Sequence, residues 1–191
     1  IVLNKNGINP SSVTVEYFGV TLFNQELALG KVDASLATIN QLADLTPVAA
    51  SNNITLGAFM LSNYGLDVAG YALLTTTTMI SQHPQEVQSF VNATLESVLA
   101  ANRNPAAAIA AELVAYPTLN STTALADFKV WYQHTIPNVN SSTFVSDPLK
   151  LGWIDPNVIN STETVIAEGF NLTQVPSPSM IYTNQFVHNP A

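Results

Sequence analysis

The chain has 191 residues, of which 47% are hydrophobic and 9% are charged, so it has enough apolar material for one large core or two small ones. Five basic residues stand against 13 acidic ones, and the net charge of −8 gives phosphate groups few cations to bind, so we expect no nucleic-acid partner. Because there is no cysteine, disulfides, thiolate metal sites and cysteine nucleophiles are excluded.

The N-terminal quarter of the chain predicts short alternating strands and helices. The opening residues read as the last turn of a helix closed by Gly7, which predicts that the chain begins within a fold. Apolar alternation and turn residues then predict, in order, strand 13–18, helix 21–29, strand 32–36 and helix 39–45. Gly30 and Pro47 supply stop signals for the two helices. This order and spacing are typical of parallel βα units.

The rest of the chain predicts a crossover followed mainly by helices. Residues 46–67 are weakly patterned, with a possible strand over 56–61, and a further strand begins at Gly70. Proline residues at helix starts and apolar stripes then predict helices over 84–102, 105–115 and 156–169. A further helix is predicted from the stripe Leu125, Phe128 and Tyr132, and Pro137 ends it. We read Trp131 and Trp153 as core residues.

A search for reactive groups finds no catalytic constellation. The three histidines, His83, His134 and His188, are far apart in the sequence, and no serine lies in a Gly-x-Ser-x-Gly elbow. No two histidines share a helix face, and the acidic residues are dispersed. Asp33 is better explained as a turn residue than as a ligand. We therefore expect no catalytic residue, no metal site and no cofactor.

Ligand-binding candidates follow from position rather than from a chemical motif. In open parallel sheets, ligands bind at the carboxyl ends of strands, where helix N-termini also offer free N–H groups to anions. Two tyrosines flank the predicted crossover, where a binding cleft is expected. The candidates are Phe18, Gly19, Thr21, Thr38, Asn40, Tyr64 and Tyr71.

The polar surface is built mainly from uncharged groups, with 19 Asn, 15 Ser and 19 Thr. This composition suits an exported protein in an acidic environment, because neutral side chains keep the same hydration at any pH. Compositional drift in a secreted protein explains it equally well. Glycosylation acceptor motifs begin at Asn53, Asn92, Asn120, Asn140, Asn160 and Asn171. Their number exceeds chance only modestly.

Several segments, in a fairly specific order, carry a resemblance to a known family. They include Gly30-Lys31-Val32-Asp33-Ala34, the paired helices with His83-Pro84 and Asn104-Pro105, Leu151-Gly152-Trp153-Ile154-Asp155 and Tyr182-Thr183-Asn184-Gln185-Phe186, together with residues 6–13 and 63–71. The chain resembles the thiamine-pyrimidine-precursor branch of solute-binding proteins. That branch is similar to the sulfonate, taurine and nitrate binding proteins of ABC importers.

The resemblance implies a doubly wound, two-lobed α/β fold of the periplasmic-binding-protein type II class, incomplete at its N-terminal side. Residues 1–66 would form part of the second lobe, and residues 67–191 would return to the first. The implied partners are a small-molecule ligand, a membrane permease and a remaining N-terminal part of the same protein. The implied location is extracellular or periplasmic, with a membrane anchor through a missing segment as one arrangement.

Three functions are compatible with these observations. The first is the solute-binding component of an ABC importer, which binds a pyrimidine or thiamine precursor, a sulfonate or nitrate by lobe closure. The second is a thiamine-pyrimidine synthase-like or desulfinase-like enzyme on the same fold, whose catalytic residues would lie outside this chain. The third is a surface glycoprotein without a ligand. We favour the first, because it needs no catalytic group.

Overall fold

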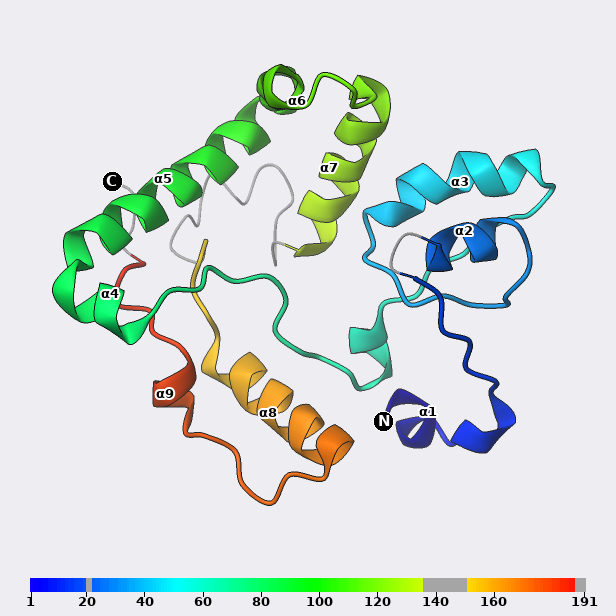
Figure 1. Ribbon diagram of the computed structural model, residues 1–191, viewed down its shortest axis with the longest axis horizontal. Coiled ribbons are helices and arrows are strands. Elements are labelled where there is room, and N and C mark those ends of the chain that lie inside the picture. Colours follow the sequence, from blue (N-terminus) through cyan, green and yellow to red (C-terminus); the bar gives the residue numbers. More distant parts are fainter. Residues whose placement is uncertain (20–21, 136–150, 188–191) are drawn as a thin grey trace. The chain divides into compact units, whose positions relative to one another are not determined.

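The computed structural model describes residues 1–19, 22–135 and 151–187, and Figure 1 shows their helices. Contacts divide the chain into two compact units. Unit 1 comprises Ile1–Val13, Met60–Leu99 and Phe144–Ala191, and unit 2 comprises Thr14–Phe59 and Ala100–Thr143. Each unit therefore collects segments that are far apart in the sequence. The predicted assignment of residues 1–66 and 67–191 to two lobes stays a prediction.

Unit 1 is built from short helical turns and two longer helices. Its described elements are α1 (Val2–Lys5), η1 (Pro10–Ser12), η2 (Leu61–Tyr64), α4 (Thr77–Gln82), most of α5 (Pro84–Arg103), α8 (Pro156–Phe170) and α9 (Pro178–Ile181). Leu95 on α5 and both Ile159 and Val165 on α8 are buried. α1 contacts η2, and α8 contacts α9.

Side-chain hydrogen bonds tie irregular segments of unit 1 to its helices. On α8, Ser161 donates to the carbonyl of Asp67 at 2.6 Å, and the Thr162 hydroxyl accepts from the Ala69 amide at 2.7 Å. These two bonds hold the extended segment that leads toward α4. Because they come from neighbouring positions of one helix, they fix the direction of that segment as well as its place.

The C-terminal segment of unit 1 is held by two amide side chains. Asn184 donates to the Ile154 carbonyl and accepts from the Ile154 amide, both at 2.9 Å. Gln88 on α5 donates to the Phe186 carbonyl at 2.7 Å. Buried or half-buried backbone groups require such partners, so these bonds replace the pairing that a neighbouring strand would supply.

Unit 2 is a set of helices joined by contacts between consecutive helices and by a contact between sequence-distant helices. Its described helices are α2 (Phe23–Ala28), α3 (Gln41–Ser51), α6 (Pro105–Ala115) and α7 (Ser121–Thr135). α3 packs against both α2 and α7, and α7 packs against α6. The buried side chains are Ala28, Ala49, Ile109 and Tyr132.

Local signals explain where the longer helices begin. Asn104 caps α6 by accepting from the Ala107 amide at 3.1 Å, and Asp155 caps α8 by accepting from the Asn157 amide at 2.8 Å. Each cap is followed by a proline at the first helical position, where a missing N–H costs nothing. The predicted helices over 84–102, 105–115 and 156–169 are confirmed.

Other predictions differ from the structure. α3 continues to Ser51 with Pro47 inside it, so the predicted end before Pro47 is wrong. Pro47 removes one hydrogen bond from the interior of α3, and Ala49, two residues later, is buried. α4 was not predicted at all, although Thr76 caps it by accepting from the Met79 amide at 3.1 Å. Trp153, expected in the core, is 52% exposed.

The predicted strands have no ladder partners within the described ranges 1–19, 22–135 and 151–187, where no strand is assigned. Val15 in the first segment is 63% exposed, and Leu74 in the segment after Gly70 is 93% exposed. A strand requires a neighbouring strand for its hydrogen bonds. The doubly wound, two-lobed α/β architecture is therefore not confirmed by the described coordinates.

Candidate functional site

The starts of α2 and α3 form the first candidate site, which we call the helix-start region. The Ser35 hydroxyl donates to Asn24 Oδ1 at 3.1 Å, and this pair is partly buried. Asn24 lies in the first turn of α2, whereas Ser35 lies near the end of the predicted strand 32–36. The bond therefore places the end of that segment beside the start of α2, as a βα arrangement requires.

Thr38 and Asn40 lie where the chain enters α3. The Thr38 amide donates to Gln41 Oε1 at 3.1 Å, and the Asn40 side chain makes no capping bond. The first three amides of α3 donate to the carbonyls of Thr38, Ile39 and Asn40 at 3.0–3.2 Å. They are not free for an anion, so the expectation that backbone amides at a helix start bind an anion is wrong at α3. At this helix start, hydrogen bonds to a ligand would come from side chains.

Phe18 and Gly19 end the exposed segment that precedes α2. The Gly19 carbonyl accepts from the Leu22 amide at 2.8 Å, which turns the chain into the helix. Phe18 is 40% exposed, so its ring is available for contact with a planar molecule. Thr21, the third candidate from this segment, lies outside the described residues.

The charged residues of the helix-start region include Glu26 in the first turn of α2 and Asp44 in the first turn of α3. Lys31, the nearest cation in sequence, forms an ion pair with Glu26 at 2.9 Å. The uncharged polar side chains of the region include the amides of Asn24 and Asn40 and the hydroxyls of Ser35 and Thr38. Such groups both donate and accept hydrogen bonds and remain neutral at all ordinary pH values. They suit an uncharged polar ligand better than a sulfonate or nitrate.

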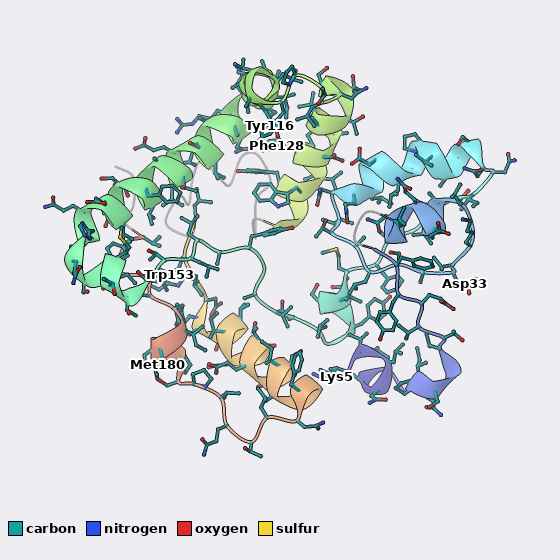
Figure 2. All side chains as sticks on the ribbon, in the orientation of Figure 1. Lys5, Asp33, Tyr116, Phe128, Trp153 and Met180 are labelled. Carbon is teal, nitrogen blue, oxygen red and sulfur yellow. The ribbon has the colours of Figure 1, made fainter. Side chains whose placement is uncertain are left out.

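The two predicted tyrosines belong to unit 1. The Tyr64 carbonyl accepts from Asn6 Nδ2 at 3.0 Å, and Lys5 Nζ donates to the next carbonyl, that of Gly65, at 3.3 Å. Figure 2 labels Lys5, whose side chain reaches from α1. These bonds fix the backbone at η2, while the side chains of Tyr64 and Tyr71 are 44% and 77% exposed. The predicted ligand residues are thus divided between two units.

An open hollow in unit 1 was not predicted from the sequence. It has a volume of about 520 Å³ and lies between α4, the start of α5 and the C-terminal segment. Its lining residues are Ile80, Pro84, Gln85, Gln88, Gln185 and Phe186. Gln88 is already bonded to the Phe186 carbonyl and to Asn92 Oδ1. The hollow is shallow, and we place the candidate site at the helix-start region instead.

The glycosylation acceptors are accessible wherever the structure describes them. Asn53, Asn92, Asn120, Asn160 and Asn171 are all exposed, and Asn140 lies outside the described residues. Asn53 and Asn171 adopt left-handed backbone conformations at the ends of α3 and α8, with φ values of 59° and 52°. Asparagine tolerates this conformation better than most residues do. Occupancy of the acceptors stays a prediction.

Comparison with protein families identifies the chain. The sequence description of the family named NMT1/THI5 like matches residues 1–108, which is more than half of the chain. The chain belongs to the NMT1/THI5-like family. This confirms the predicted resemblance and includes every candidate residue of the helix-start region. The matched range ends before residues 151–155 and 182–186, whose likeness to the family stays a prediction.

The family assignment supports the fold class only in its coarse form. NMT1/THI5-like proteins have a periplasmic-binding-protein-like fold, and their family includes solute-binding proteins. Comparisons with curated proteins and with solved structures find no match. Within the described residues, no helix has both the length and the apolar character needed to cross a membrane.

Proposed function

We propose that this NMT1/THI5-like protein is the extracellular or periplasmic solute-binding component of an ABC-type importer. The single observation that carries the proposal is the family match over residues 1–108. In the proposed mechanism, a small solute binds between two lobes and shifts the population toward a closed form. A membrane permease then receives the solute.

Within the solute classes implied by the family resemblance, we favour an uncharged heterocycle related to the thiamine pyrimidine. The helix-start region offers the Asn24–Ser35 pair and the side chain of Asn40, and its nearest cation is paired with Glu26. A buried sulfonate or nitrate needs a cation or several free N–H donors. The amides at the start of α3 are already used, so α3 offers no free N–H donors there, and Lys31 is neutralised by Glu26.

Calorimetric titration tests the proposal. We expect an aminopyrimidine alcohol to bind, and taurine and nitrate to bind at least tenfold more weakly, which corresponds to about 1.4 kcal/mol. Asn24→Ala should weaken binding by roughly tenfold, because it leaves a polar group of the solute or of Ser35 without its partner. The matched control is Ser89→Ala, which removes an exposed hydroxyl on α5 that donates to the Gln85 carbonyl.

Two outcomes would contradict the proposal in different ways. Absence of heat with all three solutes would count against solute binding itself. Tight binding of taurine or nitrate would retain solute binding but reject the uncharged ligand. Product formation from an aminopyrimidine precursor, measured by chromatography, would favour the alternative of a synthase-like enzyme on this fold.

A further inference from the structure

Hydrogen bonds from two consecutive side chains join α1 to η2 in unit 1. Asn6 Nδ2 donates to the Tyr64 carbonyl at 3.0 Å and, within its own turn, to the Val2 carbonyl at 2.8 Å. Lys5 Nζ donates to the Gly65 carbonyl at 3.3 Å. We call the bonds from these two side chains the α1–η2 clamp. They link segments that are about sixty positions apart in the sequence, and α1 and η2 are in contact.

The end of α1 favours a glycine directly after Asn6. The Gly7 amide donates to the Asn4 carbonyl at 3.1 Å, and the Ile8 amide donates to the Leu3 carbonyl at 2.9 Å. This pair of bonds is a Schellman motif, in which the residue after the helix cap adopts a left-handed backbone. Gly7 has a φ of +72°, which glycine adopts without strain. The clamp uses an amide at position 6 and the turn favours glycine at position 7, which together produce an Asn-Gly pair.

An Asn-Gly pair is prone to a spontaneous reaction that removes the side-chain amide. The glycine nitrogen loses its proton and attacks the asparagine Cγ, which closes a cyclic imide, and the side-chain nitrogen leaves as ammonia. Water then opens the ring at either carbonyl and yields aspartate or isoaspartate. Glycine promotes the attack because it has no Cβ to hinder the approach. Of the 19 asparagines in the sequence, Asn6 alone precedes a glycine.

The folded chain opposes this reaction at Asn6. The Gly7 amide is bonded to the Asn4 carbonyl, and the Asn6 amide is held by the two carbonyls of the clamp. The ψ angle of Asn6 is 16°, which turns the Gly7 nitrogen away from Cγ. Ring closure requires this nitrogen and the Asn6 Cβ to lie on the same side of the Cα–C bond. The reaction therefore requires local opening of both the turn and the clamp.

We propose that Asn6 is a site of spontaneous deamidation, which is gated by opening of the α1–η2 clamp and then releases α1 from η2. The product carries a carboxylate, which cannot donate a hydrogen bond to the carbonyls of Val2 and Tyr64. Lys5, the adjacent cation, already lies 3.9 Å from the carboxylate of Glu168. The new carboxylate thus disfavours closure of the clamp, and the loss of ammonia makes the change one-way. The site requires no ligand and does not depend on the proposed function.

Peptide mapping of the full, unmutated chain tests the site directly. The protein is incubated in mildly alkaline buffer with and without guanidinium chloride. Mass spectrometry then follows the replacement of NH2 by OH at Asn6, and chromatography separates the aspartate and isoaspartate forms. We expect modification in the denaturant and modification at least about tenfold slower without it, because the closed clamp predominates in the folded chain. Equal rates in the two conditions, or no modification in the denaturant, would overturn the proposal.

A substitution beside Asn6 tests the gating. Lys5→Ala removes the second side chain of the clamp, so the clamp should open more often and Asn6 should deamidate about two- to fivefold faster without denaturant. Lys31→Ala is the matched control, because it removes a lysine that pairs with Glu26 in unit 2, and it should leave the rate unchanged. An unchanged rate in Lys5→Ala, or equal acceleration by both variants, would show that the clamp does not gate the reaction.

Hydrogen exchange of η2 tests the consequence, with Asn6→Asp as a mimic of the product. Asn52 supplies the matched control, because it also follows the last turn of a helix, with a ψ of 14°, but its side-chain amide donates only to Val48 and Ser51 of α3 among the bonds described. We expect Asn6→Asp to speed exchange of the η2 amides about three- to tenfold and Asn52→Asp to leave it unchanged. Should Asn6→Asp fail to fold, the deamidated fraction of the unmutated protein supplies the same measurement. Equal exchange before and after deamidation would refute the release of α1.

Discussion

Substitution of Gly152 by alanine should destabilise unit 1 strongly, because two independent costs coincide at this residue. Gly152 has a φ of +79°, in the left-handed region that an L side chain rarely adopts. A Cβ at this position would also lie 2.8 Å from Leu95 Cδ2 and 3.7 Å from Val187 Cγ1. Leu95 is only 7% exposed, so it has little room to move away.

The magnitude can be worked from these contacts. The left-handed backbone costs alanine about 1 kcal/mol relative to glycine, and forcing a methyl group into an occupied site costs typically about 1–3 kcal/mol. We expect Gly152→Ala to lower the free energy of unfolding by about 2–4 kcal/mol, measured by urea denaturation. Gly57→Ala is the matched control, because nothing lies within 4 Å of its added Cβ and its φ is not positive.

A double substitution separates the two costs. Leu95→Ala removes the atoms that a Cβ on Gly152 would meet, so combining it with Gly152→Ala should cost less than the sum of the single changes. The coupling should be about 1–3 kcal/mol, which is the overpacking part. If Gly152→Ala and Gly57→Ala have equal effects, the packing described around Leu95 is wrong.

Three further substitutions test hydrogen bonds in the two units. Asn184→Ala should lower the free energy of unfolding by about 1–3 kcal/mol in urea denaturation, because both backbone groups of Ile154 lose their partner. An effect below about 0.5 kcal/mol would refute this expectation. Asn104→Ala should lower the free energy of unfolding by about 1 kcal/mol, because α6 loses its cap, and circular dichroism should show less helix. Unchanged stability would show that the cap is dispensable. Thr162→Val should cost about 1 kcal/mol and speed hydrogen exchange at the Ala69 amide, whereas equal exchange rates would argue against that bond.

Helices were predictable from this sequence where their signals are local. The pairs Asn104-Pro105 and Asp155-Pro156 each combine a capping side chain with a proline that is preorganised for the first turn. Such signals act within four residues and do not depend on the rest of the fold. The end of α3 was mispredicted because the local stop signal of Pro47 does not end the helix, which continues to Ser51 and buries Ala49 beyond the proline.

Strands and the site could be predicted only in part, because both depend on distant segments. The alternating pattern over residues 13–18 indicates side chains that favour a sheet. It does not identify the second strand that would pair with this segment. At the site, the sequence indicated Thr38 and Asn40 by their position after a predicted strand. It did not indicate the Asn24–Ser35 pair, because a bond between residues 11 positions apart forms only once the chain has turned back on itself.

The double hydrogen bond between Asn184 and Ile154 has a consequence for solubility. Exposed peptide groups in an extended segment are templates on which another chain can add as a strand, and this leads to aggregation. Here the amide of one side chain saturates both the N–H and the C=O of Ile154. A strand of another chain therefore cannot form hydrogen bonds with the backbone of Ile154. The neighbouring aromatic ring of Trp153 nevertheless remains exposed.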